Sequence, residues 1–234
     1  MKVATHLKNR LQILDQKVTQ SRLKNHKFTI ISNNCWGGEV YRALNLRYES
    51  PFVGLFMFAP CYINLVKEIT KKIDTRLNFV NVSRYELAND YREQGVWELY
   101  PIGLLNDEIE IHFMHYENEI EAREKWLRRT QRIDWNNENN IFFKFCDSGL
   151  CTKELIEEFH TLEAKHKICF TSKNYPNFAS NIWIEECQKD DSVMDGRKLY
   201  KFCHKYFDLL DWLNGGSGKI NPVKKLVNNW LYNN

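Results

Sequence analysis

The sequence predicts an α/β protein with a mostly parallel sheet, preceded by an amphipathic N-terminal helix. Short apolar runs rich in β-branched and aromatic residues alternate with segments whose apolar residues recur at helical spacing. This alternation is typical of strands joined by crossover helices, which pair in parallel. The run FVGLFMF at 52–58 is almost continuously apolar, as expected of a strand buried on both faces.

The expected elements follow one another along the chain. A strand at 28–31 (FTII) runs into a polar turn, and helical spacing resumes at 39–46. Pro60 suits the first turn of a helix that we expect to extend to about residue 72. Thr152 is a helix N-cap ahead of an apolar periodic segment. Further strands are predicted at 77–82, 141–145, 167–171 and 182–184, further helices at 118–133 and 196–212, and a short helix or loop at 83–94.

Two segments carry more specific expectations. The stretch 108–113 (EIEIHF) alternates charged and apolar residues, which predicts a strand with one exposed face or an edge position. In the helix at 118–133, Ile120, Trp126, Leu127 and Ile133 are spaced for one face. The chain thus divides into a helical extension at 1–27, a single α/β domain at 28–213, and a flexible break (NGGSG) with a C-terminal tail at 214–234, anchored by Leu226 and Trp230.

Composition limits the class of protein. At 234 residues and 43% hydrophobic content, the chain can bury the core of one domain. It has no apolar run of about eighteen residues and no apolar leader, so we expect neither a membrane span nor a secretory signal. Seven cysteines without a CxxC pair argue against a zinc ribbon or a disulfide framework, and favour reduced thiols in the cytoplasm.

Charge is unevenly distributed. Residues 1–27 hold seven Lys/Arg and one acid, which leaves 26 basic and 29 acidic residues in the remainder. Within this segment the apolar residues Val3, Leu7, Leu11, Leu14 and Val18 repeat at helical spacing. The pattern favours a basic amphipathic helix packed on the body or on a protein partner. The alternative is peripheral adhesion to an anionic membrane surface, at the inner face of the membrane. A nucleic-acid partner is not expected, because the remainder is acidic and lacks a recognised motif.

The turn after the first strand is the main candidate site. ISNNCWGG places Asn33, Asn34, Cys35, Gly37 and Gly38 between a buried strand and a helix, where open α/β folds bind their ligands. The turn matches neither GxGxxG nor GxxxxGK[ST], so no nucleotide motif is present and the cofactor stays open. The two amides suit sugar hydroxyls or an oxyanion, and equally a turn that bonds its own backbone.

Residues just past the other strands complete the candidate set. If the strands are parallel, His115 and Tyr116, then Asp147, then Ser172 share the rim with Cys35. Cys35, His115 and Asp147 would form a catalytic set in which the carboxylate orients the imidazole and the imidazole takes the thiol proton. Packing of a small buried cysteine is the competing interpretation.

Other side chains are weaker candidates. Arg129 and Arg132 lie three apart on a predicted helix and could grip a phosphate or carboxylate, although a solvated charged face is the commoner outcome. Trp36 could stack on a sugar ring, although core burial is more common. His112 and His115 would face opposite sides of a strand, so no metal site is predicted.

Several motifs resemble a known bacterial family. ISNNCWGG, the stretch 111–133 (IHFMHYENEIEAREKWLRRTQRI), SPFVGLF and YPIG resemble domain-of-unknown-function family number nineteen-nineteen, over roughly residues 24–212. This resemblance implies a three-layer α/β/α fold and a place among exopolysaccharide and capsule biosynthesis proteins. It implies no established catalytic residues. The Asn–Cys turn is also similar to that of a capsule acetyltransferase family with an SGNH-hydrolase-like fold.

Together these observations lead to a functional expectation. We expect a cytoplasmic transferase of surface-polysaccharide biosynthesis that acts on a sugar or activated sugar, with acyl transfer as the first mechanism. Glycosyl or phosphoryl transfer is the rival mechanism. A non-catalytic module that binds a glycan or a partner enzyme is the second class, and it would need no reactive thiol.

Overall fold

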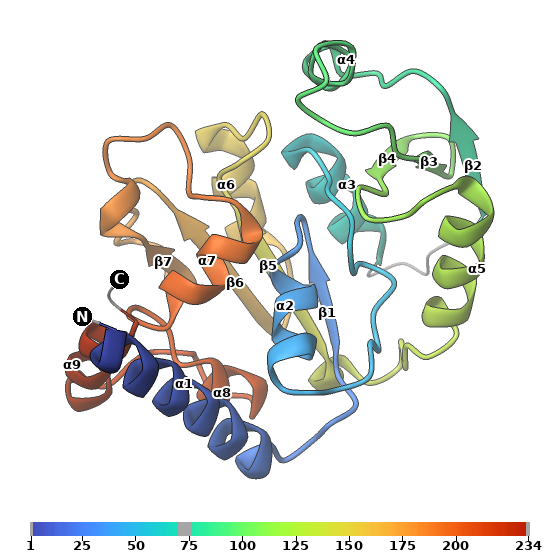
Figure 1. The fold of residues 1–234 in the computed structure, drawn as a ribbon. Helices are drawn as coiled ribbons and strands as arrows, with labels where there is room; N and C mark the ends of the chain where they lie inside the picture. The colour runs from blue at the N-terminus through green and yellow to red at the C-terminus, as the bar shows by residue number, and fades with distance from the viewer. Residues whose placement is uncertain (1, 70–75, 233–234) are drawn as a thin grey trace.

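The computed structural model describes residues 2–69 and 76–232, with side chains from residue 6 onward. Its centre is a parallel sheet of four strands in the order β1-β5-β6-β7, and a separate antiparallel sheet has the order β2-β3-β4. Figure 1 shows the antiparallel sheet beside the parallel one. The strands are β1 (Thr29–Ser32), β2 (Leu77–Val80), β3 (Ile102–Leu105), β4 (Ile109–His112), β5 (Ile141–Cys146), β6 (His166–Thr171) and β7 (Asn181–Trp183).

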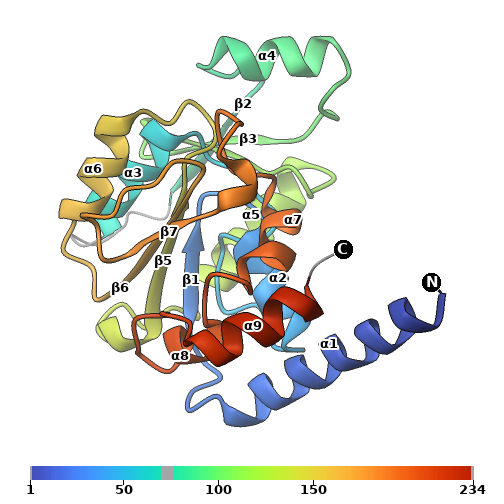
Figure 2. The ribbon, with the colours of Figure 1, turned by 90° about the vertical axis from the view of Figure 1, so that its left-hand side faces the viewer.

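Helices cover both faces of the parallel sheet, which confirms the α/β fold and the N-terminal helix. Figure 2 shows α2 and α7 on one side of this sheet and α3 and α6 on the other. The helices are α1 (Lys2–Arg22), α2 (Trp36–Ala43), α3 (Ala59–Ile69), α4 (Glu86–Glu93), α5 (Glu119–Thr130), α6 (Lys153–Thr161), α7 (Gly196–Cys203), α8 (Leu209–Leu213) and α9 (Pro222–Leu231). The expected end of the α3 helix, at 70–72, lies outside the described residues.

The core is divided by the parallel sheet into two clusters. Because side chains alternate along a strand, Ile31 and Phe143 point to one cluster while Ile30 and Phe142 point to the other. The first cluster also takes in Ile111 of the antiparallel sheet, so the two sheets share one body of buried apolar side chains. The four parallel strands therefore sit between two apolar layers, as a parallel sheet requires.

The predicted strand at 52–58 is wrong. The segment is an irregular connector that makes a single antiparallel bridge, between Phe56 and His112. Gly54 interrupts the extended run with φ +78°, and a Cβ there would lie 3.3 Å from the Tyr116 ring. Most apolar side chains of this segment are buried between the two sheets, although the segment does not pair as a strand.

The stretch 108–113 forms β4 at the edge of the antiparallel sheet, which confirms the predicted edge position, but the alternative of an exposed face is wrong. β4 is buried along its whole length, including Glu110 at 1% exposure. The Glu110 carboxylate accepts bonds from Ser83 Oγ and the Arg84 N–H, and lies 2.8 Å from His112 Nε2. A buried carboxylate is tolerated here because its oxygens are paired.

Three predicted helical patterns need correction. The helix expected at 196–212 is split into α7 and α8, because Phe207 bridges Lys219 and Asp208 caps α8. On α5, Trp126 is buried as expected, but Ile120 and Leu127 are exposed. The tail at 214–234 contains the helix α9, and its predicted anchors Leu226 and Trp230 are 74% and 52% exposed.

A buried histidine joins α7 to the C-terminal helix. His204 ends α7, its ring stacks on Tyr232 at 4.5 Å, and its carbonyl accepts a bond from the Asn228 amide on α9. Burial lowers the pKa of His204 to about 4, with Asp15 opposing the shift and Lys224 adding to it. The ring is therefore neutral in the folded protein at neutral pH.

This histidine should make stability depend on pH. Between pH 6.5 and 4 the unfolded chain protonates His204 and the folded chain does not, so stability falls as the pH falls, by roughly 3 kcal/mol at pH 4. Urea unfolding of His204→Phe, which keeps an aromatic ring without a proton, should show a smaller loss over that range. The exposed His26→Gln variant should match the wild type. An equal loss in His204→Phe would contradict the assignment.

Candidate functional site

The helix α2 begins at Trp36, three residues earlier than the expected start at residue 39. Trp36 is already helical, Cys35 is the N-cap residue, and Asn34 Oδ1 accepts the Trp36 N–H at 3.1 Å. Gly37 and Gly38 therefore belong to the first helical turn and not to a loop. A Cβ on Gly37 would lie 3.0 Å from Ile30 Cγ2, so the glycine lets the helix pack directly on β1.

His115 reaches this turn from the antiparallel sheet. It follows β4, and its N–H donates to the Gly54 carbonyl in the connector at 52–58. The same connector bonds the end of β1 through the Met57 N–H and the Asn33 carbonyl, at 2.9 Å. Cys35 and His115 therefore lie next to each other, as predicted. The expectation that His115 follows a strand of the parallel sheet is wrong, because β4 belongs to the antiparallel sheet.

A thiol, an imidazole and a guanidinium meet at the surface. Cys35 Sγ lies 3.3 Å from His115 Nε2, and Arg197 Nη2 lies 3.4 Å from the same nitrogen. Arg197 Nε is 3.7 Å from Glu39 on α2. Cys35 is half-buried while His115 and Arg197 are exposed, so a ligand in solvent has access to all three groups.

The electrostatics keep this pair neutral. Burial raises the pKa of the Cys35 thiol, although Arg197 opposes the shift. Burial lowers the pKa of His115, and the positive charge of Arg197 lowers it further. A guanidinium only donates hydrogen bonds, so its contact requires Nε2 to be an acceptor and places the ring proton on Nδ1. The thiol then donates to Nε2, which is the arrangement for general-base activation.

Asp147 does not take part in this arrangement. Its Oδ2 accepts bonds from the N–H and Oγ of Ser172, and its Oδ1 accepts the Val193 N–H at 2.8 Å. Burial raises the pKa of this carboxyl despite those bonds. The carboxylate is on the predicted edge of the sheet, but it ties the loops after β6 and β7 to β5 and does not orient His115.

The two asparagines are buried, and a lysine holds them. Lys144 on β5 is fully buried, and its Nζ donates to Asn33 Oδ1 at 3.2 Å and to Asn34 Oδ1 at 2.9 Å. Asn33 is 0% and Asn34 6% exposed, so both amides serve the turn instead of facing solvent. Sequence reasoning missed Lys144, although a lysine inside the apolar run IFFKFC was a usable signal.

The remaining candidates are bonded or packed within the protein, and Arg132 is the most exposed of them. Trp36 is fully buried against Phe170 and Trp212, so it is a core residue and not a sugar platform. Tyr116 donates to the Val53 carbonyl. Arg129 is 7% exposed and donates to Tyr116 Oη, and Arg132 donates to the Tyr48 carbonyl. The predicted anion grip by the two arginines is wrong, because they fasten α5 to the connector and to the loop after α2.

Arg197 is the site residue that the sequence did not reveal. It stands in the first turn of α7. The preceding residue must be glycine, because a Cβ at Gly196 would lie 2.7 Å from the Trp36 nitrogen and 2.8 Å from Asn34 Oδ1. Asp195 caps the helix through the N–H groups of Arg197 and Lys198. α7 is thereby pressed against the start of α2, and this contact brings Arg197 to His115.

The described residues form neither a metal-binding cluster nor a membrane-spanning helix. Within 2–69 and 76–232, no three His, Cys, Asp or Glu side chains are grouped to hold a metal ion. In the same residues no helix has the length and hydrophobicity needed to cross a membrane. All seven cysteines are free thiols.

Fold and site together define a class: an α/β protein that carries an accessible thiol–imidazole pair where β1 enters α2. The chain belongs to the family described as domain of unknown function (DUF1919), whose model matches residues 6–214. It is similar to an "Uncharacterized protein" of Haemophilus influenzae, with 31% identity over 221 residues, which cover 91% of this chain and 97% of the relative.

Proposed function

We propose that the protein is a transferase that moves an acyl group to a sugar hydroxyl through a covalent intermediate on Cys35. The observation that carries this proposal is the 3.3 Å contact between Cys35 Sγ and His115 Nε2, at a position that solvent reaches. A thiol paired with a neutral imidazole is a general-base-activated nucleophile. Arg197 beside the pair supplies a positive charge for an anionic donor or acceptor group.

The chemistry is a double displacement. As Cys35 Sγ bonds to the acyl carbon, its proton moves to His115 Nε2, and the donor's leaving group departs with that proton. In the second half, the sugar hydroxyl gives its proton to Nε2 and attacks the thioester. The carbon–sulfur bond then breaks, and the proton returns to sulfur. N–H groups in the first turn of α2 would stabilise the negative oxygen that develops in each half.

The sugar and the pathway rest on the family resemblance. ISNNCWGG and its companion motifs resemble proteins found among those of exopolysaccharide and capsule biosynthesis, and this supports a sugar or activated-sugar substrate. The seven free thiols fit a reducing, cytoplasmic setting. Glycosyl or phosphoryl transfer at the same site is the rival reaction, and in it Arg197 would hold a phosphate.

A non-catalytic binding module is the second candidate. Two observations favour it: burial raises the pKa of Cys35, and the nearby carboxylate of Asp147 is bonded to Ser172 and Val193 instead of to His115. A module that holds a glycan or a partner enzyme would need Arg197 and His115 as hydrogen-bond donors and would not need a thiolate.

Capture of the acyl-enzyme separates the two candidates. The protein is incubated with p-nitrophenyl acetate or acetyl-coenzyme A, and acetylated peptides are mapped by mass spectrometry. We expect a thioester on Cys35, formed about 10²- to 10⁴-fold more slowly in His115→Gln. Cys151→Ala, which removes the other half-buried thiol, should leave it unchanged. Acetylation that is equally fast in His115→Gln, or that falls on Cys151, would favour the binding module.

A further inference from the structure

Two helices turn apolar rows toward solvent. On α1, Leu7, Leu14 and Val18 are 52%, 54% and 46% exposed, and on α9 Val223, Leu226, Val227 and Trp230 are all more than half exposed. These seven residues make up half of the fourteen exposed large hydrophobic side chains of the described residues. An amphipathic surface helix normally points such a row into the core. Packing of the whole α1 row on the body is therefore wrong, because Leu7 and Leu14 are exposed, while packing on a protein partner stays a prediction.

Both helices contact the body through polar as well as apolar side chains. Gln12 of α1 donates to the Leu231 carbonyl, and the Asp15 carboxylate accepts a bond from Tyr232 Oη. On α9, the buried Asn228 donates to the His204 carbonyl. Both helices are therefore fixed to the protein by hydrogen bonds and a few buried side chains, Leu231 among them, while the seven apolar side chains named above remain exposed.

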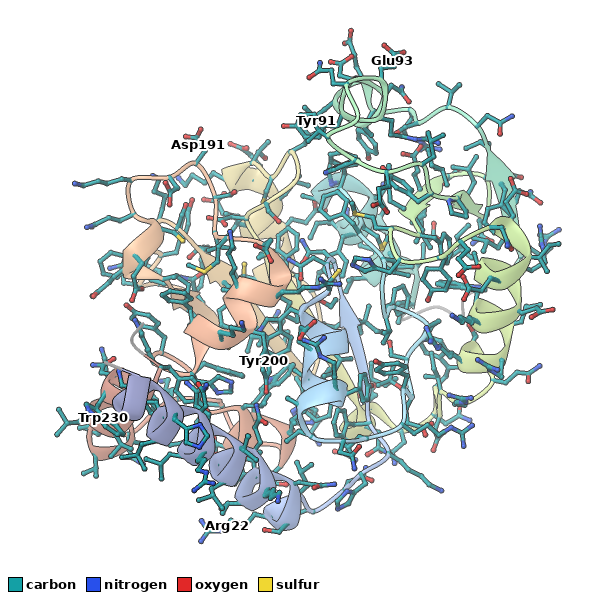
Figure 3. All side chains as sticks on the ribbon, in the orientation of Figure 1. Arg22, Tyr91, Glu93, Asp191, Tyr200 and Trp230 are labelled. Atoms are coloured by element: carbon teal, nitrogen blue, oxygen red, sulfur yellow. The ribbon has the colours of Figure 1, made fainter. Side chains whose placement is uncertain are left out.

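The two rows meet in one surface. α1 and α9 lie side by side in Figure 1 and Figure 2. Lys8 Nζ of α1 stands 5.6 Å from the ring centre of Trp230, and Trp230 lies at the outer edge of α9 in Figure 3. We call these seven side chains, Leu7, Leu14, Val18, Val223, Leu226, Val227 and Trp230, the terminal-helix surface.

The two segments that carry this surface are strongly basic. Residues 1–27 and 214–234 together hold ten Lys/Arg and a single acid, Asp15, while the rest of the chain holds 23 basic and 29 acidic residues. The Asp15 carboxylate is bonded to Tyr232. The exposed apolar rows therefore lie on two segments with a strong excess of positive charge, while the rest of the chain has an excess of acidic residues.

Exposed apolar rows on helices rich in lysine and arginine suit an anionic lipid surface. The apolar side chains, with a tryptophan among them, enter the boundary between headgroups and acyl chains, and the cations pair with lipid phosphates. A second copy of the chain fits less well, because a two-fold contact through this surface would set two strongly basic patches against each other. A nucleic acid would use the cations but not the apolar rows.

We propose that α1 and α9 together form a docking surface for a bilayer that contains anionic lipid, on which both helices lie flat. The surface brings together the two ends of the chain, so neither helix supplies it alone. The inference is independent of the thiol chemistry, since acyl capture by Cys35 is measured without lipid.

Co-sedimentation of the full chain with vesicles tests this surface. Binding should be strong with phosphatidylcholine–phosphatidylglycerol vesicles, absent with phosphatidylcholine alone, and weakened by salt. The double variant Val227→Ser/Trp230→Ser should lose affinity about tenfold or more. The charge variant Lys17→Glu/Lys225→Glu should lose it as well. The matched control Leu99→Ser/Ile120→Ser, two exposed apolar residues elsewhere, should bind as the wild type.

Two outcomes would overturn the proposal. One is wild-type protein that stays in the supernatant with anionic vesicles, or sediments equally with neutral ones. The other is a wild-type dimer in light scattering that Val227→Ser/Trp230→Ser converts to a monomer, which would assign the surface to self-association. Circular dichroism of each variant establishes that it is folded, and no fold loss is expected because the substituted side chains are exposed.

Discussion

Cys35→Ser is expected to reduce the turnover of an activated acyl ester at least about a thousandfold, because a hydroxyl at this position is far less nucleophilic than a thiol. Among the cysteines of the described chain, Cys35 alone combines partial exposure with a hydrogen-bond contact to an imidazole, at 3.3 Å. The measurement is steady-state hydrolysis of p-nitrophenyl acetate, with binding of an anionic sugar followed separately by calorimetry. Binding should survive the substitution, since the thiol is the attacking group and Arg197 provides the charge.

The matched control for this prediction is Cys151→Ser. Cys151 is also half-buried, but its hydrogen bond goes to the Thr152 carbonyl, and no imidazole of the described residues is bonded to it. Its pKa is raised by burial, so we expect its removal to change turnover little. Turnover retained in Cys35→Ser would exclude covalent catalysis through this thiol, and loss in both variants would point to damage to the fold.

Lys144→Met is expected to destabilise the protein by about 2–4 kcal/mol, although methionine keeps the length of the apolar stem. The variant removes the Nζ donor from two buried amide oxygens, those of Asn33 and Asn34, and leaves Asn33 Oδ1 dependent on the weaker Cys146 thiol. Because Asn34 also caps the Trp36 N–H, the start of α2 should loosen. Urea unfolding at neutral pH measures the loss.

Lys153→Met serves as the comparison for this stability measurement. Its side chain is 66% exposed and pairs with Glu157 in solvent, so its loss should cost no more than about 0.5 kcal/mol. If the two variants unfold at the same urea concentration, the buried lysine contributes nothing to the turn. The structural account of Asn33 and Asn34 would then fail.

Much of the fold was predictable because its determinants are local. The buried strand, polar turn and helix around Cys35 follow from β-branched residues, asparagines and glycines within a dozen positions, and Thr152 caps α6 as expected. The same local rules failed at 52–58, where an apolar run is buried between two sheets without pairing as a strand. An apolar run indicates that a segment is buried, but it does not indicate which part of the protein buries it.

The candidate site was predictable only in part. The strand order suggested that Cys35 and His115 approach each other, and they do, but His115 arrives from an antiparallel sheet through the connector. Asp147 lies on the same rim yet bonds Ser172 and Val193. Hydrogen bonding depends on differences of less than an ångström in side-chain placement, and strand order does not fix these.

The sequence by itself determined the α/β class, the thiol at the start of α2 and the basic amphipathic pattern of the first helix, since each rests on neighbouring residues and their periodicity. The tertiary structure decided that Arg197 joins the thiol–imidazole pair, that Lys144 is buried among the asparagines, and that the rows on α1 and α9 face outward. The reason is physical: periodicity shows that a helix has an apolar face, but only packing of distant segments decides whether that face meets the core or the surroundings.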